Sequence, residues 1–366
     1  MHAELHENQL TATAFVLLLS PALRLFPAAA AQSAGKGVWL CAPLAFFPAA
    51  LYLFFYCRAA ARRREGEGLC ELLLRAAPGR RGRAALLVLA AWLALYAGFV
   101  LRSGADRFIV TVYPNTPAAF FVLTMAAAAL AAAFAPLRDA ARCARLFLPV
   151  VAPVLALVLG AALFSVRGEN LLPLEAGALG GVLKGSLPAL DVLVWTIFAA
   201  GLLLPELPRG ALSFPRLLRA LACGCAVLSL LGACLVGCFG AALTGELSWP
   251  FFSLVRNLVF FRSIERIEAL VVALWILPDF LIVSLFLRGA ARALALAPGR
   301  RWPLFAKKRF SLPLCAAAAV GFALLAAPDA QRLQLLSTRL IPAANLFFSL
   351  VFLPGVLAAG RLNGRI

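Results

Sequence analysis

The first long apolar segment of the chain contains a charged, proline-rich interruption between Ser20 and Pro27. Pro21 and Pro27 each lack the backbone N–H that a helix needs, so we expect the helix to bend or unwind here and to free polar backbone groups. Arg24 adds a positive charge at the same depth. Such a broken, charged helix is typical of a small-ligand site, whereas the structural alternative is a simple kink in which Arg24 pairs with a carboxylate on a neighbouring helix.

Other charged residues interrupt apolar segments further along the chain. Arg102 and Asp106 are four residues apart, so they share one helix face, and the spacing predicts an ion pair at the outer boundary of the membrane. Asp279 follows Pro278 inside an apolar segment, with no partner nearby in the sequence. It can pair with Arg24 or take up a proton, and we favour pairing.

The composition indicates whether these residues lie in a soluble protein or in a membrane protein. The chain has 366 residues, of which 63% are hydrophobic, far more than a soluble core of this size can bury. The sequence therefore predicts an integral membrane protein. The net charge of +18 comes from short arginine blocks without interleaved aromatic residues, a pattern that indicates topology signals and contacts with anionic lipid, and not binding to nucleic acid.

Catalytic and metal-binding patterns are not found in the sequence. Most of the nine cysteines lie inside apolar segments, and no cysteine pair is accompanied by histidine at metal-ligand spacing. The two histidines, His2 and His6, precede the first apolar segment. We therefore expect no metal, no cofactor, no disulfide framework and no enzymatic activity.

Ten apolar stretches are long enough to cross a bilayer. They cover residues 10–30, 38–57, 84–105, 117–137, 146–166, 188–204, 217–243, 267–287, 311–327 and 340–360. Alternate connections, together with the C-terminal tail, carry 23 of the 34 basic residues, and because cytoplasmic loops hold the excess of Lys and Arg, both termini are predicted to be cytoplasmic. The most basic connection, 58–83, is too polar to cross, and its later half favours a short amphipathic helix or, alternatively, a solvated loop.

Ten spans divide into two sets of five, about 9–166 and 188–360, within one domain. The sixth span is then the counterpart of the first, and its small residues Ala199, Ala200 and Gly201 mark a position where a helix can unwind. This pattern fits two inverted repeats with a ligand site between broken helices 1 and 6. Asn345 in the tenth span is expected to form an interhelical hydrogen bond.

A distinctive aromatic segment lies between the seventh and eighth spans. Trp249 and Pro250, followed by phenylalanines, suit a re-entrant or surface-lying element at the outer headgroup level. Glu265, Arg266 and Glu268 then open the eighth helix, where carboxylates suit the N-terminal helix dipole.

This segment resembles a known family. The pattern W-P-x-x-S-L from Trp249, followed by F-x-x-x-E-R-x-E-A-L-x-V-x-x-W-I from Phe261, is similar to the hallmark of the B-subunit family of spore germinant receptors, the GerAB-type spore germination permeases. Arg102 with Thr116-Pro117, Asn170-Leu171-x-Pro173 and Leu204-Pro205-Glu206 agree with it. The resemblance covers essentially the whole chain.

The resemblance implies an all-α polytopic protein of the amino acid/polyamine/organocation permease superfamily. It implies a receptor subunit that binds a small germinant such as an amino acid and triggers germination, in the spore inner membrane, with a membrane-anchored A subunit and a C-subunit lipoprotein as partners. The chain departs from the family pattern at two places: Ser20-Pro21-Ala22 stands where a glycine-bearing break is usual, and Ala199 stands where a glutamate is often found. An anionic or less polar germinant is therefore conceivable.

The expected ligand site combines residues of the first and sixth spans. These are Ser20, Ala22, Leu23, Arg24, Phe198, Ala199, Ala200 and Gly201. The alternative function is a proton-coupled amino acid permease, in which Asp279 or Glu206 carries the proton.

Overall fold

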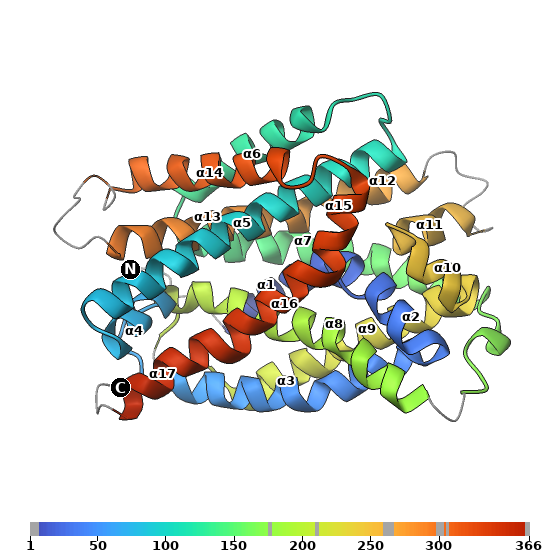
Figure 1. The fold of residues 1–366 in the computed structure, drawn as a ribbon, viewed down its shortest axis with the longest axis horizontal. Coiled ribbons are helices and arrows are strands. Elements are labelled where there is room, and N and C mark those ends of the chain that lie inside the picture. Colours follow the sequence, from blue (N-terminus) through green and yellow to red (C-terminus); the bar gives the residue numbers. More distant parts are fainter. Residues whose placement is uncertain are drawn as a thin grey trace.

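The structure is a computed structural model that describes residues 7–174, 178–208, 212–258, 267–297, 304 and 307–362. All regular structure in these residues is helical (Figure 1). The α-helices are α1 (Glu7–Arg24), α2 (Pro27–Ala34), α3 (Val38–Ala61), α4 (Leu69–Ala76), α5 (Arg80–Thr111), α6 (Ala118–Phe134), α7 (Leu137–Leu163), α8 (Ala178–Ala200), α9 (Phe214–Phe239), α10 (Ala241–Glu246), α11 (Pro250–Asn257), α12 (Ile267–Leu274), α13 (Ile276–Leu296), α14 (Lys308–Leu325), α15 (Ala330–Leu335), α16 (Ile341–Leu346) and α17 (Leu353–Leu362). The 3₁₀ segments are η1 (Gly35–Gly37), η2 (Gly168–Asn170) and η3 (Gly201–Glu206), and the π-helical segments are η6 (Leu336–Leu340) and η7 (Phe347–Phe352).

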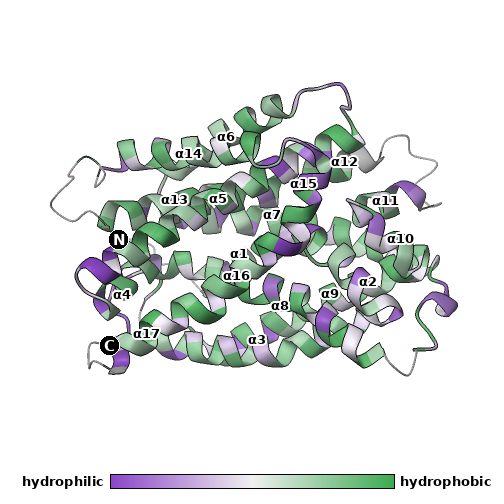
Figure 2. Cartoon of the chain, in the orientation of Figure 1, coloured by the Kyte–Doolittle hydropathy of each residue, from purple (hydrophilic) through white to green (hydrophobic). Residues whose placement is uncertain are grey.

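Eight helical segments in the described residues are long and apolar enough to cross a membrane. They are Pro27–Ala61, Arg80–Thr111, Leu137–Leu163, Ala178–Glu206, Phe214–Phe239, Val271–Leu296, Lys308–Leu325 and Ala330–Arg361. Two shorter apolar helices, Gln9–Arg24 and Ala118–Phe134, coincide with the first and fourth expected spans. The prediction of an integral membrane protein is confirmed, and Figure 2 shows hydrophobic residues along the long helices, with hydrophilic residues in connections such as the loop that leads into α4.

Proline begins or precedes several of these helices. Pro27 and Pro250 occupy the first position of α2 and α11, while Pro117 and Pro136 immediately precede α6 and α7. The N–H groups in the first turn of a helix have no acceptor within the helix, so a proline at this position loses no helical hydrogen bond. These prolines therefore fix where the helices start.

The helices pack in two groups. In the first group, α5, α6, α13 and α14 contact one another, and in the second, α1, α2, α3, α8 and α9 do so (Figure 1). Helix α7 contacts α1 and α9 as well as α13, and α1 also contacts α13, so the groups are joined along these helices. Each group combines helices from the first and second halves of the chain.

The connection 58–83 forms the predicted amphipathic helix, α4. Its apolar side is buried against the bundle through Leu69, Cys70, Leu72, Leu73 and Ala76. The prediction of a helix here is confirmed, and the alternative of a wholly solvated loop is wrong because five of the eight residues of α4 are buried.

Close packing in the first group depends on Gly98 of α5. A Cβ atom at this position would lie 2.3 Å from the carbonyl oxygen of Ala319 on α14, so only glycine allows the two backbones to approach this closely. Gly321, two residues further along α14, faces open space.

We predict that Gly98→Ala lowers the stability of the protein by about 1–3 kcal/mol, because a backbone carbonyl cannot move aside as a flexible side chain can. Gly321→Ala is the control: it should be neutral or stabilising by up to about 1 kcal/mol, since alanine is the better helix former. Unfolding of the purified protein in detergent, followed by circular dichroism, measures both. Equal effects of the two changes would contradict the packing argument.

Candidate functional site

The first apolar segment is interrupted as predicted, at Leu25 and Phe26. Helix α1 continues through Pro21 and ends at Arg24, and α2 begins at Pro27. Pro27 has no N–H to donate to the carbonyl of Leu23, so the hydrogen-bond ladder stops there. The break places Arg24 at a helix end inside the protein, where its side chain is only 6% exposed.

Arg24 contacts the segment between α10 and α11. Its Nη1 donates a hydrogen bond of 2.8 Å to the backbone carbonyl of Ser248, and its guanidinium lies 4.5 Å from the ring centre of Trp249. The Nε group is buried and has no hydrogen-bond partner. Stacking on an indole stabilises the cation, yet Arg24 forms no ion pair with any described residue.

Trp249 connects Arg24 to α5. Its Nε1 donates a hydrogen bond of 2.9 Å to Oδ2 of Asp106, whose Oδ1 lies 3.8 Å from Nη1 of Arg102. The predicted pairing of Arg102 with Asp106 is thus confirmed, and both residues are buried. Trp249 itself is 5% exposed, so its ring packs inside the protein.

Asp279 does not pair with Arg24, contrary to our prediction. Its Oδ2 lies 2.5 Å from Nη2 of Arg107, and both side chains are 1% exposed. The Ser20 hydroxyl donates a hydrogen bond to Oδ1 of the same carboxylate. Arg107 follows Asp106 on α5 and therefore points about 100° further around the helix, toward α13.

These residues form one buried cluster, the arginine–aspartate cluster. It contains the guanidinium groups of Arg24, Arg102 and Arg107 and the carboxylates of Asp106 and Asp279, and the other two arginines and Asp106 are near enough to act electrostatically on Arg24. Asp106 and Asp279 neutralise two of the three positive charges. One positive charge is left uncompensated by the described side chains, and Arg24 is the arginine without a carboxylate partner.

The residues expected from the sixth span lie elsewhere. Helix α8 narrows to the 3₁₀ segment η3 at Gly201, as the small residues suggested. Phe198 is buried and stacks on Trp195 with ring centres 4.8 Å apart, and Ala199 is also buried. Ala200 and Gly201 line an apolar cavity of about 70 Å³.

This cavity faces the first half of α1. Leu10, Phe15 and Leu18 line it from α1, and neither Ser20 nor Arg24 does. The sixth-span residues therefore face the first half of α1, whereas Ser20 and Arg24 lie near its end. Ala22 and Leu23 are buried in the protein core.

The sequence prediction missed a second buried polar cluster. Asp191 of α8, Asn345 of α16 and Ser349 of η7 are each 0% exposed, and none of their side-chain oxygens has a hydrogen bond of ordinary geometry in the described structure. Asn345 is near enough to interact with the Asp191 carboxyl group. Asp191 lies in the middle of an apolar span, and this pattern could have identified it from the sequence. In the structure, π-helical segments, which are frequent at functional sites, flank Asn345.

The remaining predicted residues have weaker structural support. Glu206 ends η3 and is half-buried. Glu265 and Arg266 lie outside the described residues, and of Glu268 only the backbone, in α12, is described. Across the described ranges, no three His, Cys, Asp or Glu side chains are placed to hold a metal ion.

We predict that Asp279→Asn destabilises the protein by about 3–5 kcal/mol, because it leaves Arg107 buried without a counter-charge. Asp139→Asn is the matched control, since Asp139 pairs with Arg142 at 3.1 Å on the surface, and should cost less than about 1 kcal/mol. Thermal unfolding in detergent measures both. Adding Arg107→Gln to Asp279→Asn should recover part of the loss, and a loss as small as that of the control would refute the buried pair.

A comparison with known proteins identifies the family of the chain. A family model described as a spore germination protein matches residues 4–320. A comparison with curated proteins finds no match. The matched range contains both the broken first helix and the arginine–aspartate cluster, and covers most of the chain, so the protein belongs to the spore germination protein family.

Proposed function

We propose that this protein is the B subunit of a spore germinant receptor, and that it binds a small germinant through an anionic group placed at Arg24. The observation that carries the proposal is the uncompensated positive charge of the arginine–aspartate cluster. An unpaired charge inside a membrane protein is costly and is retained where it serves a ligand. Family membership supports a role in germination.

The proposed fold is a transporter-like bundle of ten membrane helices in two inverted repeats. The two packing groups support it, because each takes helices from corresponding places in both halves of the chain. Helices α1 and α3 pack with α8 and α9, while α5 and α6 pack with α13 and α14. The first and sixth spans each contain a break, after Arg24 and at Gly201.

The proposed ligand is a small molecule with a carboxylate. A guanidinium has five N–H donors, and one N–H of Arg24 donates to a described residue, the carbonyl of Ser248, so a bidentate carboxylate can be accepted by others. Ser20, Ala22 and Leu23 would line the site beside it. Asp279 is engaged by Arg107 and Ser20, so it is not available to meet a ligand ammonium group.

The residues of the sixth span would contact the apolar part of the ligand. Phe198, Ala199, Ala200 and Gly201 stay candidates for this role, since the last two line the apolar cavity beside α1. A ligand that uses both regions needs an anionic end and an apolar end, which favours an anionic or weakly polar germinant.

The proposed setting is the spore inner membrane, with both termini in the cytoplasm. The excess of arginine in alternate connections supports this orientation. The proposed partners are a receptor A subunit and a C-subunit lipoprotein.

A second candidate function is proton-coupled amino acid transport, and Asp191 favours it. Asp279 is held by Arg107, whereas the Asp191 carboxyl group is fully buried without a counter-charge among the described residues. A carboxyl group in that setting can exchange a proton during transport. Asp191 is thus a better candidate for proton coupling than Asp279 or Glu206.

We predict that spores carrying Arg24→Ala need at least about tenfold more germinant for half-maximal germination, because a charge-assisted hydrogen bond to the ligand is lost. Arg256→Ala, which removes an exposed arginine of α11, is the control and should leave the response unchanged. The loss of optical density during germination measures the response at equal receptor abundance. Wild-type sensitivity of Arg24→Ala spores to every germinant would overturn the assignment.

Flux assays separate the two candidate functions. Vesicles that contain the purified protein should bind germinant without accumulating labelled amino acid if the protein is a receptor. Uptake that follows a proton gradient and is abolished by Asp191→Asn would instead establish the permease.

A further inference from the structure

A basic cavity opens where the end of α3, α4 and α17 meet. Its volume is about 400 Å³, within the range of small-molecule sites. The lining residues are Tyr52, Phe54, Phe55, Tyr56, Arg58, Ala59, Arg62, Leu72, Leu353, Pro354, Leu357, Ala358 and Arg361. Gly360 fixes α17 here, because a Cβ at that position would lie 2.6 Å from the Cα of Ala76 at the end of α4.

The lining carries three positive charges and no negative one. Arg58, Arg62 and Arg361 are exposed, and none of their guanidinium groups forms an ion pair or a hydrogen bond within the described residues. Three unpaired guanidinium groups around one cavity repel one another unless an anion lies between them. The cavity is therefore electrostatically complementary to a phosphate.

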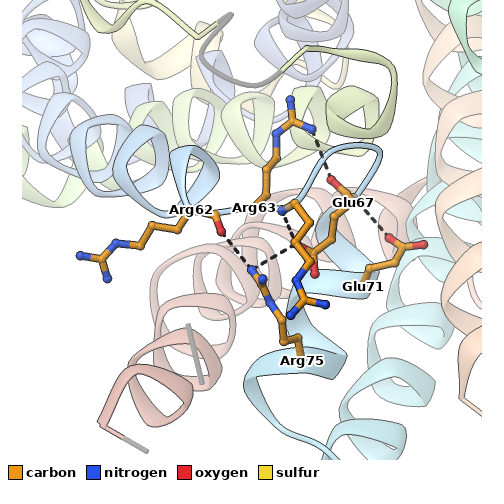
Figure 3. Close-up of polar contacts among 7 residues, drawn as sticks. Arg62, Arg63, Glu67, Glu71 and Arg75 are labelled. Atoms are coloured by element: carbon orange, nitrogen blue, oxygen red, sulfur yellow. Dashed lines mark hydrogen bonds and ion pairs between the residues drawn. The ribbon is translucent and has the colours of Figure 1, made fainter. Parts of the chain in front are cut away.

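Two of the three acidic residues of the neighbouring connection, Glu67 and Glu71, are already paired, and the third, Glu65, does not line the cavity. Glu67 pairs with Arg75 at 3.1 Å, and Glu71 pairs with Arg292 at 2.5 Å. Arg75 also donates a hydrogen bond of 3.1 Å to the carbonyl of Arg62. Figure 3 shows Glu67, Glu71 and Arg75 together and the Arg62 side chain pointing away from them, so these carboxylates do not neutralise the cavity.

The wall next to the arginines is apolar and continues along a helix. Phe54 and Phe55 of α3 are 41% and 59% exposed, and Leu51 and Phe47, further back on the same helix, are 58% and 72% exposed. Since α3 belongs to a segment long and apolar enough to cross a membrane, these side chains form a continuous surface for a hydrocarbon chain. Positive charge at the mouth and apolar surface beyond it match the two parts of a phospholipid.

We propose that this cavity binds an anionic glycerophospholipid. Arg58, Arg62 and Arg361 hold the phosphate, and an acyl chain lies along Phe54 and Phe55. A basic pocket between membrane helices, at the end of the bundle that carries most of the arginines, is the type of site that selects anionic headgroups. The bound lipid joins α17 to α3 and α4, so it also stabilises the C-terminal helix.

The test compares two triple variants of the full-length protein. Arg58→Gln, Arg62→Gln and Arg361→Gln together remove the charges of the cavity. Arg80→Gln, Arg81→Gln and Arg83→Gln remove the same charge from the exposed start of α5, and none of these three residues lines the cavity. Purified proteins are titrated with phosphatidylglycerol in mixed micelles, with phosphatidylcholine as the neutral lipid and glycerol phosphate as the free headgroup. Lipid retained on the protein is measured by native mass spectrometry, and thermal stability is measured in parallel.

We expect the cavity variant to bind phosphatidylglycerol on the order of tenfold more weakly than the wild type, and the α5 variant to bind like the wild type. Phosphatidylcholine and glycerol phosphate should give no stabilisation, since one lacks net charge and the other lacks the acyl chain. Equal losses in the two variants would show non-specific charge attraction, and stabilisation by glycerol phosphate alone would indicate a soluble phosphate ligand. Either result overturns the lipid site. Leu357→Trp, which fills the cavity without changing charge, should weaken binding as well, and unchanged binding would contradict the proposal.

Discussion

The buried ion pair between Arg107 and Asp279 is the interaction on which the arrangement of this protein depends. It joins α5 to α13, and the Ser20 hydroxyl adds α1 to the same carboxylate. Two charges at 1% exposure are costly to bury and are tolerated only because they face each other at 2.5 Å. The pair therefore fixes α13 against α5 within one packing group, and the hydrogen bond from Ser20 connects this group to α1 of the other.

Local features of the structure could be predicted from the sequence. Pro27 stops the helix because it lacks an N–H, and Arg102 and Asp106 pair because four residues return a helix to the same face. The amphipathic α4 follows from the spacing of Glu71 and Arg75, which lie four residues apart on one face and leave the other face apolar. In each case the physical cause lies within a few residues of its effect.

The long-range pairings could not be predicted in the same way. Asp279 was expected to pair with Arg24, and its pairing with Arg107 instead depends on the rotation of α5 against α13, which no local pattern encodes. The predicted ligand site divided for a similar reason. The helix break at Gly201 faces the first half of α1, and no local pattern in either helix encodes the level at which α1 and α8 cross.

The position of Arg24 suggests how ligand binding can act on the whole bundle. Arg24 belongs to α1, while Trp249, on which it stacks, donates a hydrogen bond to Asp106 of α5. The uncompensated charge thus lies at the boundary between the two packing groups, where Asp106 attracts it and Arg102 and Arg107 repel it. A ligand carboxylate would remove that repulsion. A ligand shifts a conformational equilibrium only if it interacts more favourably with one conformation than with the other. The repulsion that the carboxylate removes is therefore the free energy available to drive a conformational change. A neutral ligand in the same place would fill space but would leave the repulsion between the two groups unchanged.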